Sequence, residues 1–279
     1  MNPSGAPDPL YILARRVLLD ALEALGAQRH AAILVGAQAV YLHTGPAGLA
    51  VPEYTTDADI ALNPEFLADT PRLEEIMKGA KFEPDGSNVG SWVTKRLQKG
   101  REVDVKVDLL IPSAIGGKGR RGARLGVHGN KAARKVKGLE AALVDQNPMA
   151  IASLKPAADP RNFKIAVAGP AALLIAKLHK LADRQEDAGR LNDKDALDAL
   201  RLLRSTNTEK LARVFEDLLK DKIAGGVTRD AIKLLENLFA KPESPGSRMA
   251  AQAVTPLEPP DTTAASCSAL ATDLLRVLK

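Results

Sequence analysis

The sequence predicts an α/β (α+β) fold, in which a lobe of strands and helices precedes a helical C-terminal lobe. Residues 91–97 and 102–110 alternate like neighbouring strands of a meander. Residues 10–25 carry apolar side chains at helical spacing and are followed by Gly26, a common helix stop. After residue 169 the apolar spacing is mostly helical. We therefore expect an α/β lobe over 1–168, a helical lobe over 169–241, and a Pro-rich linker with a terminal helix over 242–279.

Short apolar runs and turn residues predict the other elements of the first lobe. A strand at 31–35 leads through Gly36 into a helix. A Gly/Pro loop at 45–52 precedes a strand at 57–62, and Asn63-Pro64 then begins a helix that runs to Met77. Residues 139–168 indicate two or three short strands, with turns at 145–148 and 159–162.

The second lobe is predicted as a series of amphipathic helices. Gly169-Pro170 opens the first of them, and a polar loop at 185–190 follows it. The Pro-, Ser-, Thr- and Ala-rich stretch 242–266 is typical of a linker. The later helices are expected from about Asn192, over 208–222, over 228–240 and over 268–278.

Composition indicates a bacterial-type cytoplasmic enzyme with an anionic partner. The net charge is +5 and the pI is about 9.2, which favours nucleic acid or phosphate ligands. The single cysteine, Cys267, excludes an internal disulfide and fits a reducing compartment. The N-terminal residues lack the features of a signal peptide, and the longest apolar stretch, 165–176, contains Gly169-Pro170 and is too short to span a bilayer. No membrane role is expected.

Asp57 and Asp59 are the central pair of candidate metal ligands. Carboxylates at i and i+2 on a strand point to the same face, and a third acid on a neighbouring strand would complete a set of oxygen donors for hard cations. Asp104 and Asp108 both lie on the polar face of strand 102–110. We favour Asp108, because apolar residues follow it. An acid flanked by buried apolar positions usually needs a partner such as a metal ion. Asp104 beside Lys106 resembles a solvated ion pair.

Cationic residues gather in two further places. The stretch 113–137 contains six glycines, eight lysines and arginines and no acid, which predicts a mobile basic loop that suits RNA phosphates or, alternatively, a solvated loop without a ligand. On the helix after Gly169, Lys177, Lys180 and Arg184 form one stripe. That stripe could hold nucleotide phosphates or be a solvated face. Similarly, Asp195 and Asp198 could be functional acids or belong to an intrahelical salt-bridge set with Lys194 and Arg201.

Four motifs occur in an order that resembles a known group of enzymes. Over roughly residues 30–205, the chain resembles the DNA-polymerase-β-like nucleotidyltransferases, and within them the AbiEii and MenT-type toxins of type IV toxin–antitoxin systems. The resemblance implies a mixed sheet with flanking helices. The motifs are Gly36-Ala37-Gln38, Thr55-x-Asp57-x-Asp59, Asp108-Leu109-Leu110, and Lys177-Leu178-His179-Lys180 followed by Asn192-Asp193-Lys194-Asp195.

The resemblance also implies residue roles. Two Mg²⁺ ions would be held by Asp57, Asp59 and Asp108 while NMP is transferred from an NTP substrate. Lys177 matches the essential lysine of the toxins, and Asp195, with Asp198 as second choice, would orient Lys177 or bind the base or sugar. The active site is expected in the cleft between the lobes. Residues expected to bind the nucleotide are Gly36, Ala37, Gln38, Thr55, Lys177, Lys180 and Arg184.

Three functions follow as hypotheses. The first is a toxin that transfers NMP to RNA, with the tRNA 3′ end as the expected acceptor, and so inhibits translation and growth unless a cognate antitoxin protein restrains it. The second is a nucleotidyltransferase that modifies a small molecule such as an aminoglycoside, or a protein side chain. The third is a non-catalytic RNA-binding module, whose RNA binding would not depend on Asp57 or on Mg²⁺.

Overall fold

The computed structural model describes residues 7–45, 47–86, 88–185 and 193–279. The chain forms two compact units, each assembled from separate stretches of sequence. The first unit contains the chain up to Ala39 together with Glu53–Val136 and Gln146–Val167. The second contains Val40–Pro52, Lys137–Asp145 and Ala168–Lys279.

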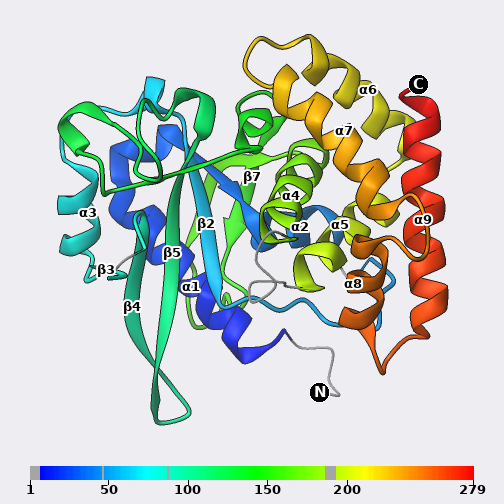
Figure 1. The fold of residues 1–279 in the computed structure, drawn as a ribbon. Helices are drawn as coiled ribbons and strands as arrows, with labels where there is room; N and C mark the ends of the chain where they lie inside the picture. Colours follow the sequence, from blue (N-terminus) through cyan, green and yellow to red (C-terminus); the bar gives the residue numbers. More distant parts are fainter. Residues whose placement is uncertain (1–6, 46, 87, 186–192) are drawn as a thin grey trace. The chain divides into compact units, whose positions relative to one another are not determined.

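One mixed sheet holds the strands described in the first unit (Figure 1). The strands are β1 (Ala32–Val35), β2 (Asp57–Leu62), β3 (Glu83–Pro84), β4 (Ser91–Gln98), β5 (Arg101–Pro112), β6 (Arg134–Val136), β7 (Gln146–Ala152) and β8 (Asn162–Ala168). Their order is β3-β4-β5-β2-β1-β8-β7, and β6 pairs with β5. β2 runs parallel to β5 but antiparallel to β1, and β4 runs antiparallel to β5. The predicted mixed sheet is therefore confirmed.

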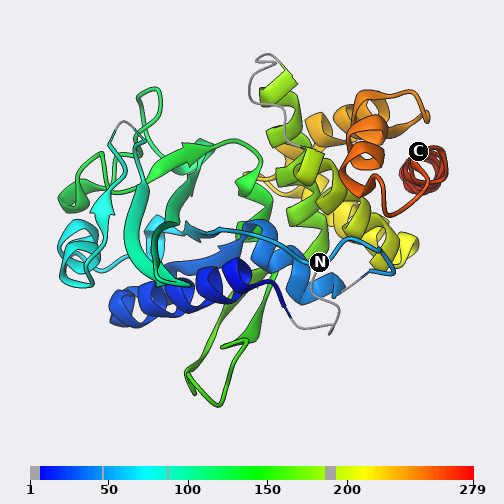
Figure 2. The ribbon, with the colours of Figure 1, turned by 90° about the horizontal axis from the view of Figure 1, so that it is seen from below.

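Helix α1 (Pro9–Leu25) covers one face of this sheet (Figure 2). Its apolar stripe packs against the apolar positions of β2 and β5, where the pairs Ala58–Val107 and Ile60–Leu109 are buried. Because successive strand side chains point to opposite faces, the alternate positions of β2 and β5 lie on the face away from α1. The shorter helix α3 (Leu73–Gly79) also contacts α1.

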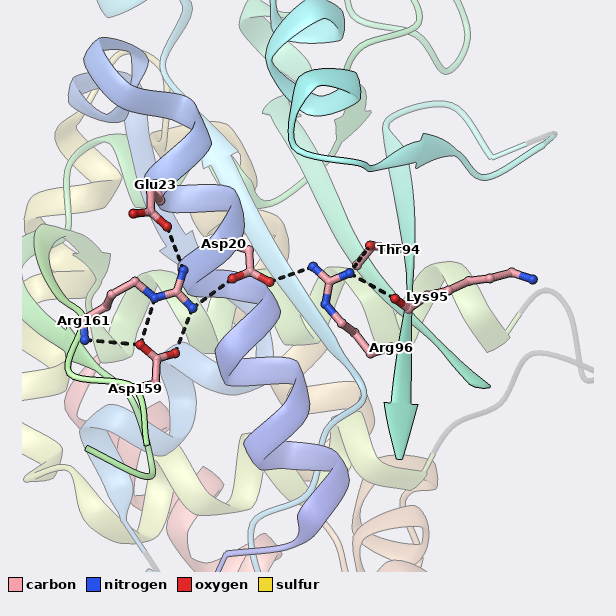
Figure 3. A network of polar contacts seen from close by, with 7 residues as sticks. All are labelled: Asp20, Glu23, Thr94, Lys95, Arg96, Asp159 and Arg161. Atoms are coloured by element: carbon pink, nitrogen blue, oxygen red, sulfur yellow. Dashed lines mark hydrogen bonds and ion pairs between the residues drawn. The ribbon is translucent and has the colours of Figure 1, made fainter. Parts of the chain in front are cut away.

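A network of ion pairs centred on Asp20 fixes α1 to the sheet (Figure 3). The two oxygens of Asp20 accept from Arg96 on β4 and from Arg161 just before β8, each at 2.8 Å. Arg161 also binds Asp159 at 2.8 Å and Glu23 at 2.9 Å. These carboxylates, Asp159 first, hold the pKa of Arg161 above its usual range. The network joins three segments that are far apart in sequence.

The second unit is helical, as the sequence predicts. Its core contains fully buried side chains from several helices, among them Leu200, Leu235, Val254 and Leu274. α5 packs against α8, and α8 packs against α9. Helix α2 (Gly36–Thr44) begins at the end of β1. The other described helices are α4 (Pro170–Gln185), α5 (Asp193–Ser205), α6 (Thr208–Lys220), α7 (Gly225–Phe239), α8 (Pro245–Val254) and α9 (Pro260–Val277).

The expected linker at 242–266 is wrong, because this stretch contains α8 and the first turns of α9. Pro245 and Pro260 each stand in the first turn of a helix, where the missing N–H of proline costs nothing. Ala250 and Val254 are fully buried in the second unit. Prolines that start helices thus give this stretch the composition of a linker.

Two local predictions also fail. A continuous helix over 63–77 does not form, because Pro71 disfavours helical geometry at the preceding residue, and only a short turn and α3 result. The expected turn at 145–148 lies instead at the start of β7. There the half-buried Asp145 accepts from the N–H of Ala172 at 2.9 Å and so caps α4. Burial raises the pKa of Asp145, and the Ala172 bond partly offsets this effect.

Among the described residues, no helix combines the length and the apolar character needed to cross a bilayer. Residues 186–192, which include most of the expected polar loop and Asn192, lie outside the described residues.

Candidate active site

Three aspartates lie next to each other on the sheet face away from α1. β2 and β5 pair in parallel with Asp59 directly opposite Asp108, and Asp57 is two residues earlier on β2. Adjacent strands lie about 4.8 Å apart, so the carboxylates of a facing pair can share a ligand. Asp104 pairs with Lys95 on β4 and is exposed. Since the first β2 residue, Asp57, is already opposite Lys106, Asp104 lies beyond the paired part of β2.

Thr55 and Arg134 contact the carboxylates of Asp57 and Asp108. The hydroxyl of the buried Thr55 donates to Asp57, and Arg134 forms an ion pair with Asp108. Lys106 forms an ion pair with Asp85 at 2.6 Å, and this contact lowers the pKa of the Asp85 carboxyl. Within the described parts of the chain, no three His, Cys, Asp or Glu side chains converge closely enough to hold a metal ion. The donor atoms and the register suit a hard divalent cation, whereas the present side-chain positions do not form a closed cluster.

Gly36 allows the chain to turn from β1 into α2 beside Asp59. Its φ of +69° lies in the left-handed region. A Cβ atom at this position would overlap the carboxylate of Asp59. Glycine is therefore required both by the backbone angle and by the close approach of the acid, so Gly36 does more than permit a turn.

The contact predicts a measurable effect of Gly36→Ala. We expect it to lower the free energy of unfolding by about 1–3 kcal/mol, because the left-handed backbone and the displaced Asp59 side chain both cost energy. Gly100→Ala is the matched control, since Gly100 has φ +76° and open space at the Cβ position. Urea unfolding measures both. Equal losses in the two variants would show that the contact with Asp59 contributes nothing.

Gln38 links the start of β2 to α1. Its side chain is buried, donates to the carbonyl of Asp57 at 3.0 Å and accepts from Arg15 at 2.7 Å. Arg15 also donates to Tyr11 and to the carbonyl of Ala152, each at 3.0 Å. Burial raises the pKa of the Tyr11 hydroxyl to about 12. Gln38 thus positions Asp57 through its backbone, which is a supporting contact not foreseen for this residue.

A second cluster of charges, in the second unit, centres on Asp195 of α5. The predicted stripe on α4 meets this one carboxylate. Lys177 donates to Asp195 at 2.8 Å and to Asp198 at 2.6 Å. Lys180 lies 3.3 Å and Arg184 2.6 Å from Asp195. The structure therefore brings together all five residues that the sequence singled out on these two helices.

Burial and neighbouring charges shift the pKa values in this cluster in opposite directions. Burial alone would lower the pKa of Lys177, but Asp195 and Asp198 outweigh it and raise that pKa. Likewise, burial alone would raise the pKa of Asp195, but Lys177, Lys180 and Arg184 hold it well below its usual range. Lys177 is 5% exposed, so its ammonium is committed to the two aspartates. The side chain of Lys180 is 42% exposed and is the most accessible cation of the cluster.

The basic stretch 113–137 is folded against the end of β5. β6 pairs in parallel with β5, and the N–H of Ala123 donates to Ala133 at 3.0 Å. Lys135 donates to the carbonyls of Gly117 and Gly119 and so holds the stretch together. Six cations are exposed, namely Lys118, Arg120, Arg121, Arg124, Lys131 and Lys137.

Three arginines make contacts that the sequence does not predict. Arg15 is buried on α1, although its position one turn after Tyr11 could have indicated an inward-facing charge. Arg201 is buried on α5, where it donates to Val51 at 2.6 Å and lies over the ring of Tyr41. Arg134 was one of many cations in the basic stretch, and nothing in the sequence separated it from its neighbours.

A pocket of about 680 Å³ lies elsewhere, on the α1 side of the sheet. Asp20, Lys81, Arg96 and Leu97 are among its lining residues. It contains none of the aspartates of β2 or β5, and Asp20 already neutralises Arg96 there. This pocket is therefore separate from the candidate metal ligands.

Comparisons with known proteins give one match. A family described as Nucleotidyltransferase matches residues 15–224, which include both charged clusters. Searches among curated proteins and solved structures give no match. Nucleotidyltransferases transfer NMP from a nucleoside triphosphate and generally use a divalent metal ion. With three quarters of its length matched, and with the mixed sheet and paired aspartates described above, the chain belongs to the nucleotidyltransferase family.

Proposed function

We propose that the chain is a Mg²⁺-dependent enzyme that transfers NMP from an NTP to an RNA acceptor, with the tRNA 3′ end as the expected target. The observation that carries the proposal is the register that sets Asp108 beside Asp59. Asp57, Asp59 and Asp108 would hold the metal, which would supply activation of the acceptor hydroxyl and neutralisation of the leaving pyrophosphate. Gly36 holds the backbone close to Asp59, and Gln38 and Thr55 position Asp57.

The charged cluster on α4 and α5 includes cations that would bind nucleotide phosphates. We assign this role to Lys180 and Arg184, which are more exposed than Lys177. Lys177 would act with them, oriented by Asp195 and Asp198. Ala37, at the start of α2, has no side-chain donor, so it can contribute only its backbone to a phosphate.

The basic stretch supports RNA as the acceptor. All of it except Lys137 belongs to the same unit as the three aspartates, and β6 pairs with β5 just beyond Asp108. Its exposed cations have no acidic neighbours within the stretch. Such a surface suits a polyanion better than an aminoglycoside, which is itself cationic.

The acceptor can be tested with Arg120, Arg121 and Arg124. Replacing all three by alanine should lower RNA labelling at least about tenfold and flatten its salt dependence, because fewer counterions are released on binding. The assay would use purified protein, each α-labelled NTP and total RNA. The control is the triple alanine variant of Lys210, Arg213 and Lys220, which removes the same charge from the exposed side of α6.

The result separates the candidate functions. Nucleotide binding should be unchanged in both triple variants. If the Arg120/Arg121/Arg124 variant labels RNA normally, the basic stretch does not bind the acceptor. If label enters a small molecule or a protein instead of RNA, the RNA proposal fails and a transferase that modifies that class of acceptor replaces it.

A toxin role, with a cognate antitoxin protein as partner, completes the proposal and rests on the resemblance of the motifs. Expression of the wild-type chain alone should then arrest bacterial growth, and the arrest should disappear with Asp59→Asn. A harmless wild type would contradict the toxin role without affecting the enzyme assignment.

A further inference from the structure

Arg134 contacts the candidate metal site. It begins β6, where it pairs with Leu110 of β5, two residues after Asp108. Residues 108 and 110 share the face that carries the aspartates. From this position the Arg134 guanidinium forms an ion pair with Oδ2 of Asp108. The Arg134 side chain is 36% exposed and that of Asp108 is 17% exposed, so the pair lies at the surface of the site.

The backbone around Arg134 is firmly held. The N–H of Gly90 donates to Lys131 at 3.1 Å, and the indole of Trp92 donates to Ala132 at 3.0 Å. The N–H of Lys135 donates to Arg121 at 2.8 Å. A Cβ atom at Gly90 would overlap the backbone of Ala133 and Arg134, so the two segments are packed without space between them. Only the long side chain of Arg134 is therefore free to change its position.

This ion pair offsets the repulsion between Asp59 and Asp108. Asp59 and Asp108 are directly opposed, and like charges in facing positions repel. The guanidinium keeps its charge at every physiological pH, so it can act as a permanent counter-ion. A metal ion held by the aspartates would compete with the guanidinium for the negative charge of the Asp108 carboxylate.

We propose that Arg134 is a built-in counter-ion of Asp108 that exchanges with the metal ion when the site is loaded. The inference rests on the proposed function, since it takes the aspartates as metal ligands. In this exchange no covalent bond changes, and the guanidinium leaves Oδ2 of Asp108 as the cation arrives. The basic stretch thereby gains one more available positive charge at the moment the site is loaded.

The test is the affinity of the purified full chain for Mn²⁺, measured by electron paramagnetic resonance of the free ion. Arg134→Gln should bind Mn²⁺ about three- to tenfold more tightly than the wild type, because the competitor is gone. Arg134→Lys should stay close to the wild type. Arg124→Gln is the matched control, since it removes one charge from the same stretch and is exposed. Its affinity should not change.

A second set of measurements distinguishes failure of the exchange from failure of the proposed metal site. Fluorescence of Trp92, the one tryptophan of the chain, reports whether the stretch remains docked in Arg134→Gln. Unchanged or weaker Mn²⁺ binding by Arg134→Gln overturns the exchange. If Asp108→Asn weakens Mn²⁺ binding in the same series, the proposed metal site stands even then. If Asp108→Asn and Asp59→Asn both bind Mn²⁺ like the wild type, the proposed metal site fails and the exchange fails with it.

Discussion

Asp59→Asn should abolish nucleotidyl transfer, with a loss of more than about a thousandfold in rate, while the fold is retained. Asparagine has nearly the same shape, but it removes the negative charge that would bind the metal. The groups around Asp59, including the close contact with Gly36, should accept the amide. The measurement is transfer of α-labelled NMP at saturating Mg²⁺, with circular dichroism to confirm the fold.

Asp108 and Asp104 provide the internal comparison for this prediction. Both lie on the same face of β5, but Asp108 is opposite Asp59 whereas Asp104 is opposite exposed Lys95. Asp108→Asn should therefore lose activity as severely as Asp59→Asn, and Asp104→Asn should keep most of it. Inactive Asp104→Asn beside active Asp108→Asn would move the third ligand to Asp104. Full activity of Asp59→Asn would remove the aspartates from the mechanism.

The sheet and its acidic face could be predicted because the signals are local. Along β5, apolar and polar side chains alternate every second residue, so Val105 and Val107 lie on one face and Asp108 on the other. Helical spacing on α4 and α5 similarly indicated that Lys177, Asp195 and Asp198 occupy particular helix faces. The family match adds the general reaction but no residue roles.

What the sequence did not show depends on contacts between distant residues. The ion pair of Arg134 with Asp108 joins positions 26 residues apart, and the bond of Arg15 to Gln38 joins positions 23 apart. No periodicity carries such information.

The incorrect linker prediction has a different cause. Proline breaks a helix when it lies in the interior, but it is well accommodated in the first turn. Composition does not show where a helix begins, so it cannot distinguish the two cases.

Lys177→Met should be the most destabilising single change considered, at about 3–5 kcal/mol in the free energy of unfolding. Methionine fills similar space but leaves two buried carboxylates without their shared ammonium. Asp195 keeps Lys180 and Arg184. Asp198 is affected most, since its Oδ2 loses the Lys177 bond and its Oδ1 makes no hydrogen bond within the described residues. The measurement is urea unfolding at pH 7, followed by circular dichroism.

The pH dependence of this loss has a definite sign. In the wild type the pKa of Asp195 is lowered, so its stabilising contribution is present above its unfolded pKa of about 4 and is lost as the pH falls below that value. Lys177→Met removes one of the three cations that lower this pKa, so the variant has less of this contribution to lose. The deficit of the variant relative to the wild type should therefore shrink as the pH falls below about 4.

Lys180→Met is the control that separates a structural lysine from a phosphate-binding one. Lys180 lies on the same helix and contacts the same carboxylate, but its side chain is 42% exposed, so its removal should cost no more than about 1 kcal/mol. Adding Asp198→Asn to Lys177→Met should recover part of the lost stability, because the uncompensated charge is removed. If Lys177→Met unfolds like the wild type and loses only nucleotide binding, the ammonium acts directly on the phosphates. If it loses stability and Asp198→Asn restores it, Lys177 holds α4 and α5 together, and Lys180 with Arg184 must carry the phosphate contacts.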